Sequence, residues 1–223
     1  MSVPAPEIVP IFATPFGVVV LPDAPALNES LLPLFSARAT PQWQEPSRPA
    51  APRVFRSRDD LYEWPEEPVQ RLARGMLAGV SAVAASINPF APEQFAALRV
   101  ESRAWFSIVQ PEGCVPSISY ANSAWLAVYC VAAPEPSPSR FDSGVLRLHE
   151  SRLGTMFPDA TTSEARMPYK HGHVTWRPQP GQMAVFPGAM THEIALVRSL
   201  GALVLVTARV RFVGPEQAGV PWW

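Results

Sequence analysis

The chain has few of the features that would support a disulfide framework, a membrane span or an electrostatic interface. Two cysteines among 223 residues are too few for a set of disulfides, and neither Cys114 nor Cys130 has a CxxC or Cys/His spacing. Apolar runs such as residues 201–206 are far shorter than a bilayer crossing, and the first ten residues lack the pattern of a secretion signal. A net charge of −1 shows no excess of basic residues that would indicate binding to nucleic acid or anionic lipid. We therefore expect a cytoplasmic protein without nucleic-acid or membrane partners.

Length and hydropathy pattern indicate one domain, residues 1–223, built mainly from β-strands. The chain is 48% apolar and can bury a sizeable core. After residue 97, short apolar runs alternate with turn signals, which is typical of a double-stranded β-helix, the jelly-roll or cupin-like type of fold. We expect the core at residues 97–214 and a tail at 215–223, with strands at 98–109, 124–132, 144–150, 173–177, 183–186, 192–197 and 202–212. Cys130 falls in one of these strands, where a thiol acts as a small apolar side chain.

Residues 1–96 are organised differently, with helices flanking the expected barrel. Apolar residues at helical spacing predict a helix over 27–37, in which Pro33 should lie in the first turn or end the helix. The proline-rich stretch 40–52 should be extended. A second stripe at intervals of three and four predicts a helix over 66–87 that braces the outside of the barrel, with Pro65 and Pro68 tolerated near its start.

Three blocks of sequence carry a family resemblance: residues 105–131 (WFSIVQPEGCVPSISYANSAWLAVYCV), 144–152 (GVLRLHESR) and 174–194 (VTWRPQPGQMAVFPGAMTHEI). In order and approximate spacing they resemble the 2-oxoglutarate/iron(II) oxygenase family of bacteria and phages. The opening segment Ile11–Phe16 is similar to that family's first strand. The resemblance implies a double-stranded β-helix that holds an iron ion and 2-oxoglutarate.

The residues that would carry the family's chemistry are mostly absent. Ile118 and Tyr120 stand where the resemblance implies a His-x-His pair, and His192 stands at the last ligand position. An Arg-x-Ser strand should then grip the carboxylate of 2-oxoglutarate, yet Ala202 and Leu203 occupy that region. Such an iron site needs three protein ligands on one face of the ion, and an isoleucine provides none. We therefore interpret these five positions as vestigial, and expect no catalytic, metal-binding or cofactor-binding residues and no cofactor.

Two functions follow from this interpretation. The first is a catalytically degenerate barrel that serves as a binding or assembly subunit, because fold and activity are separable. The second is an active dioxygenase that hydroxylates a small molecule or a peptide side chain, with iron(II) and 2-oxoglutarate held by a rebuilt site. His149, His173 and His192 are the candidates for that site, and His171 is the remaining histidine of the chain.

Tryptophans outside the expected barrel indicate where a protein partner or a second copy of the chain would bind. Trp43 lies in the proline-rich stretch, and Trp222 and Trp223 end the chain. Tryptophan is enriched among the residues that dominate interfaces. The alternative is that the tail folds back onto its own barrel.

Overall fold

The computed structural model describes residues 13–47, 51–136, 139–150, 166–169, 172–215 and 222. Within them, the α-helices are α1 (Ala24–Arg38), α2 (Glu67–Ser86) and α3 (Pro92–Ala96), with 3-10 turns at Pro41–Trp43 and Leu61–Glu63. The strands are β1 (Gly17–Val20), β2 (Val54–Arg56), β3 (Arg99–Val109), β4 (Val115–Ile118), β5 (Trp125–Ala132), β6 (Leu146–His149), β7 (His173–Trp176), β8 (Gln182–Pro187), β9 (His192–Ile194) and β10 (Leu203–Val213).

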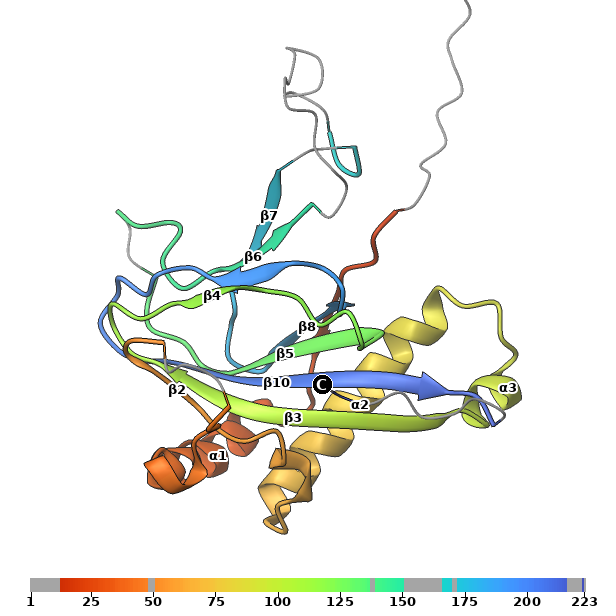
Figure 1. Ribbon diagram of the computed structural model, residues 1–223, viewed down its shortest axis with the longest axis horizontal. Helices are drawn as coiled ribbons and strands as arrows, with labels where there is room; N and C mark the ends of the chain where they lie inside the picture. The colour runs from red at the N-terminus through yellow and green to blue at the C-terminus, as the bar shows by residue number, and fades with distance from the viewer. Residues whose placement is uncertain are drawn as a thin grey trace, which may run out of the picture.

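The strands form two antiparallel sheets, as expected for a double-stranded β-helix. The larger sheet has the order β1-β8-β5-β10-β3-β2, and the smaller has the order β4-β9-β6-β7. The helices α1 and α2 lie on one side of the larger sheet, and the smaller sheet lies on the other (Figure 1). None of the described helices is long and apolar enough to cross a membrane.

Alternation along the central strands divides the core into two clusters. On β5, Ala127, Tyr129 and Val131 pack toward the helices, whereas Leu126, Val128 and Cys130 point between the sheets. Cys130 is fully buried, and burial raises the pKa of its thiol to about 12. Its predicted role as a small apolar side chain is therefore confirmed.

The helix α2 covers the sheet as its apolar stripe predicts. Val69, Leu72, Met76 and Val80 are all fully buried on its inner face. Gly79 allows the close approach, because a Cβ there would lie 2.5 Å from the Cε atom of Met183 on β8.

The helix α1 differs from the prediction, since Pro33 lies inside it and neither starts nor ends it. Its buried face, with Leu31 and Phe35 fully buried, holds the helix across the proline through tertiary packing. A buried hydrogen bond of 2.7 Å from the hydroxyl of Tyr129 to the side-chain oxygen of Asn28 ties it to β5.

The expected strands from residue 98 onward are all present, although β9 is shorter than predicted. The strand β4 was not among the expected strands, because its residues Val115–Ile118 lie in a segment rich in proline, glycine and serine. Its pairing with β9 makes it a strand. The proline-rich stretch was expected to be extended, but its described part contains a 3-10 turn at Pro41–Trp43 and further turn residues at 46–47 and 52, and residues 48–50 lie outside the described residues. Part of the predicted opening strand Ile11–Phe16 lies outside the described residues, and β1 begins just after it.

Candidate functional site

The structure brings together three of the five positions that the resemblance singled out. The strand β9 pairs with β4 so that His192 lies directly opposite Ile118. The rings of His192 and Tyr120 are 6.0 Å apart, and Phe186 on β8 lies 5.3 Å from the same imidazole. These side chains gather where the chain leaves the smaller sheet toward the larger one.

A cavity of about 590 Å³ lies beside this cluster, between the two sheets. The larger sheet lines it with Trp105, Ser107, Val128, Leu205 and Thr207, and the smaller sheet with Val115, Ile118, Leu146, His192 and Ile194. The walls are therefore mostly apolar, with a few polar side chains. The space between the sheets is thus hollow at this point.

Ala202 and Leu203, which occupy the region where the resemblance implies an arginine for 2-oxoglutarate, do not line the cavity. Ala202 packs with the helix-side cluster, and Leu203 is buried between the sheets but does not line the cavity. On β10 the side chains that reach the cavity are those of Leu205 and Thr207.

His192 is held as a neutral imidazole with a defined orientation. The residue is 6% exposed, and its Nδ1 lies 3.1 Å from the backbone oxygen of Met190. A carbonyl oxygen can only accept, so Nδ1 carries the proton and Nε2 is left as an acceptor. Burial lowers the pKa of His192 below its usual value of 6.5, which keeps the ring neutral at neutral pH.

We expect His192 to make the protein less stable in mild acid. The folded state holds this imidazole at a lower pKa than the unfolded chain, so stability is complete above about pH 6.5 and falls as the pH drops below that value. Denaturant melts between pH 7.5 and 5.5 should show this loss, and His192→Phe should reduce it. Glu193, whose pKa is lowered mainly by the hydroxyl of Ser117, contributes only below its usual pKa of 4.5. An equal loss in His192→Phe would contradict the assignment.

His149 and His173, the other candidates for a rebuilt metal site, lie on the opposite face of the smaller sheet from His192. The register pairs Leu148 with His192, and side chains alternate, so His149 points away from the cavity. The rings of His149 and His173 are 6.0 Å apart, and Nε2 of His149 is 3.7 Å from a carboxylate oxygen of Glu193. His171 lies outside the described residues. The three candidates therefore do not converge on one ion.

The residues around His192 do not fit a conventional iron centre of this fold. Such a centre needs three converging protein ligands, and Ile118 has no donor atom. Within the described part of the chain, no group of three histidine, cysteine, aspartate or glutamate side chains could hold a metal ion.

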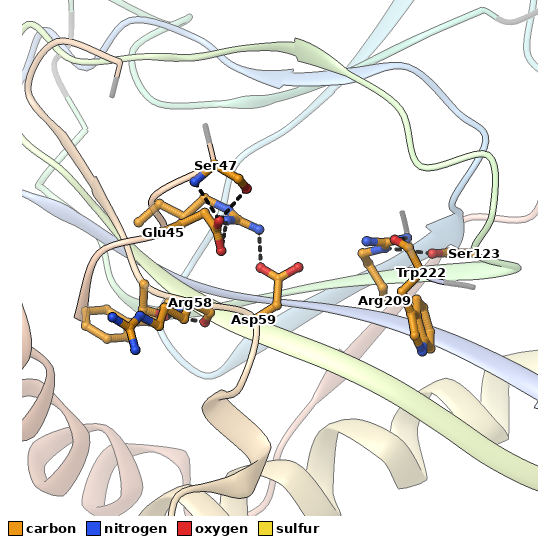
Figure 2. A network of polar contacts seen from close by, with 10 residues as sticks. Glu45, Ser47, Arg58, Asp59, Ser123, Arg209 and Trp222 are labelled. Atoms are coloured by element: carbon orange, nitrogen blue, oxygen red, sulfur yellow. Dashed lines mark hydrogen bonds and ion pairs between the residues drawn. The ribbon is translucent and has the colours of Figure 1, made fainter. Parts of the chain in front are cut away.

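A second hollow of about 430 Å³ adjoins the cavity and shares Glu45, Arg56 and Tyr120 with it. Figure 2 shows its polar side chains in two clusters, one around Glu45 and Asp59 and the other around Arg209. Sequence reasoning missed this region, because Arg56 belongs to a short strand with no motif around it.

Arginines in this region are held by both aromatic rings and polar groups. Arg56 stacks over Trp105 at 4.2 Å, donates to Asp59 and lies 3.6 Å from a carboxylate oxygen of Glu45. Arg209 lies 4.9 Å from the ring of Tyr120 and donates to the hydroxyl of Ser123 at 2.9 Å. Thr207, Arg209 and Arg211 alternate in an otherwise apolar strand, and this period-two pattern could have revealed the first two as candidates.

The described tryptophans of the predicted interface contact their own chain. Trp43 packs against Trp64 with ring centroids 5.1 Å apart. The ring of Trp222 lies 3.8 Å from the guanidinium of Arg211, and its backbone oxygen accepts from Arg209 at 3.0 Å. Trp223 lies outside the described residues. A role in assembly stays a prediction for these positions.

Comparison with known proteins finds similarity only in solved structures. No family model matches the sequence, and no curated protein matches it. AviO1 from Streptomyces viridochromogenes Tue57 is 16% identical, with 94% of each chain covered and a TM-score of 0.59. A prolyl-4-hydroxylase from Pseudomonas putida is 15% identical, with 90% of this chain and 93% of that chain covered and a TM-score of 0.57. HygX from Streptomyces hygroscopicus, solved with nickel and 2-oxoglutarate bound, is 14% identical, with 92% and 84% covered and a TM-score of 0.55.

These neighbours establish the fold and correct one expectation. The chain has the double-stranded β-helix architecture of 2-oxoglutarate/iron(II) oxygenases, as the resemblance implied. The expectation that no cofactor is involved is contradicted, because its structural neighbours are enzymes of the kind that uses iron and 2-oxoglutarate, and HygX holds nickel and 2-oxoglutarate. Missing ligand side chains were an insufficient reason to expect none.

Proposed function

We propose that this chain binds a small organic molecule in the cavity between its two sheets and is degenerate as an oxygenase. The observation that carries this proposal is the pairing of Ile118 with His192 beside a cavity of about 590 Å³. An aliphatic side chain stands where an iron centre of this fold would need a ligand. The space that would receive a substrate is nevertheless open.

The cavity has the size and composition of a ligand site. Small-molecule pockets occupy about 300–1,000 Å³ and combine apolar walls with a few well-placed polar groups. Val128, Leu146 and Leu205 supply apolar walls here, and each is almost completely buried in the fold. Trp105 and Tyr120 add aromatic rings, which pack well against the rings of a ligand.

The one imidazole at the site is placed to contact a ligand in the cavity. A facial iron centre draws three ligands from the protein, whereas His192 supplies one. Its Nε2 can instead accept a hydrogen bond from a molecule in the cavity. The site thus has a polar group for a ligand, but its described residues do not provide three converging ligands for iron.

Succinate formation tests the loss of oxygenase activity. The full chain is loaded anaerobically with iron(II) and 2-oxoglutarate, the latter seen in HygX, and then exposed to oxygen. The oxygenase reaction would convert the keto acid and oxygen to succinate and carbon dioxide, with the second oxygen atom passing to a substrate or, without one, being reduced to water by ascorbate added to the assay. We expect the wild type to produce no more succinate than His192→Ala, because the described residues supply no three converging ligands to activate oxygen.

Succinate from the wild type that His192→Ala abolishes would contradict the degenerate assignment. It would also show that His192 belongs to a working metal centre completed by groups other than Ile118. Iron analysis of both loaded proteins, made in parallel, then gives the stoichiometry of that centre.

A further inference from the structure

Three buried polar side chains face the cavity without a partner. His192 is 6% exposed, Ser107 is 6% and Thr207 is 8%, and all three line the cavity. Among the described residues, neither hydroxyl makes a hydrogen bond, and Nε2 of His192 makes none either. Buried polar groups are normally hydrogen-bonded, since an unmet donor or acceptor costs stability. All three reach the cavity, where a bound molecule with matching polar groups would satisfy them.

These groups lie on opposite walls of the cavity. Ser107 is on β3 and Thr207 is on the neighbouring β10, and the register pairs Ser107 with Leu205 and Thr207 with Trp105. The two hydroxyls are thus diagonal neighbours on the inner face of the larger sheet. His192 approaches from β9 of the smaller sheet. A ligand that satisfies all three groups must carry polar atoms at two separated ends.

The charges around the cavity favour a neutral ligand. Of its lining residues, Glu45 and Arg56 lie 3.6 Å apart and partly neutralise each other, and Arg56 also binds Asp59. The deeper lining, formed by residues such as Val128, Leu146 and Leu205, carries no charge. An ionised group buried there would lose its hydration without a counter-ion, whereas a hydroxyl would need one hydrogen bond.

We propose that the ligand is a neutral, mainly apolar ring compound with a hydroxyl or amine that donates to Nε2 of His192, and a second polar group at its far end for Ser107 and Thr207. This inference rests on the proposed function and specifies its ligand class. The aromatic side chains of Trp105 and Tyr120 in the lining favour a ring over a flexible chain, which would lose more conformational freedom on binding.

Three bicyclic probes test this ligand class in calorimetric or fluorescence titrations of the full chain. They are 2,6-dihydroxynaphthalene, which carries a hydroxyl at each end, naphthalene, which carries none, and 2,6-naphthalenedicarboxylate, which is charged. We expect the dihydroxy compound to bind at least about tenfold more tightly than the other two, since each hydrogen bond to a buried group contributes up to roughly tenfold.

Variants of the three polar side chains identify which contacts are made. His192→Phe, Ser107→Ala and Thr207→Val should each weaken the dihydroxy compound by roughly threefold to tenfold and leave naphthalene unchanged. Thr175→Val, on an exposed part of β7, is the matched control and should alter neither. The two hydroxyl variants are nearly isosteric, so they still decide the question if His192→Phe fails to fold.

The outcomes separate this inference from the proposed function. Equal affinity for the dihydroxy compound and naphthalene, or no effect of the three variants, would overturn the polar recognition while the cavity still binds ligands. Preference for the dicarboxylate would overturn the neutral class. Absence of saturable binding by all three probes would overturn both the ligand class and the proposed binding function.

Discussion

Replacing Phe106 with alanine should lower the free energy of unfolding by about 4 kcal/mol. Phe106 is fully buried on the helix side of the larger sheet, where its ring stacks on Phe35 at 4.4 Å. Phe55 at 5.3 Å and Trp64 at 5.9 Å complete the surroundings, so four aromatic rings from four segments meet there. The substitution removes these contacts and leaves a cavity between α1 and the sheet.

Urea denaturation measures this loss. Phe141→Ala is the matched control, because that ring is 83% exposed and its removal should change stability by less than about 0.5 kcal/mol. A loss of under about 2 kcal/mol for Phe106→Ala would mean that α1 does not rest on the sheet as the structure places it.

The second large effect concerns tryptophan substitutions on the two faces of β5, one of which faces a packed core and the other the cavity. Val128 and Val131 both lie on β5 and are almost fully buried, but Val131 packs toward the helices whereas Val128 lines the cavity. A tryptophan at position 131 overpacks a filled core and should destabilise the fold by about 3 kcal/mol. A tryptophan at position 128 has open space to enter and should cost less than about 1 kcal/mol.

Thermal and denaturant melts of Val128→Trp and Val131→Trp decide between the two environments. Equal and large losses would show that the space between the sheets is packed, and the proposed ligand site would then be lost. Both variants retain the alternation of β5, so the comparison isolates the volume available on each face.

Regular periodicity made much of the fold predictable from the sequence. The helix α2 places apolar residues at a period that identifies both the element and its buried face, and β5 is recognisable as a short continuous apolar run that is buried on both faces. The strand β4 carries no such signal, because Pro116 and Ser117 resemble loop residues and only the partner strand β9 defines the pairing. The prediction that Pro33 lies in the first turn or ends the helix was wrong for a related reason. The tertiary packing of Leu31 and Phe35 outweighs the local cost of the proline.

The candidate site was predictable where chain order alone locates a residue. Ile118 and His192 were identified by their places in the first and third blocks, and the structure sets them opposite one another. Ser107 could not be identified, because a single hydroxyl residue within an apolar strand has no distinctive signature, whereas Thr207 shares a period-two pattern with Arg209. Whether the space beside such a hydroxyl is filled depends on how the two sheets pack together. That packing involves strands from distant parts of the sequence.

The affinity of 2,6-dihydroxynaphthalene for Val128→Trp tests the central claim most directly, because the added indole fills the proposed ligand site and leaves the rest of the surface unchanged. Titration of this variant beside the wild type needs only folded protein and the probe. The account predicts saturable binding to the wild type and a loss of at least about 100-fold in the variant, since the probe and the indole compete for the same volume. The same dissociation constant for both proteins would contradict it, because the probe would then bind outside the cavity.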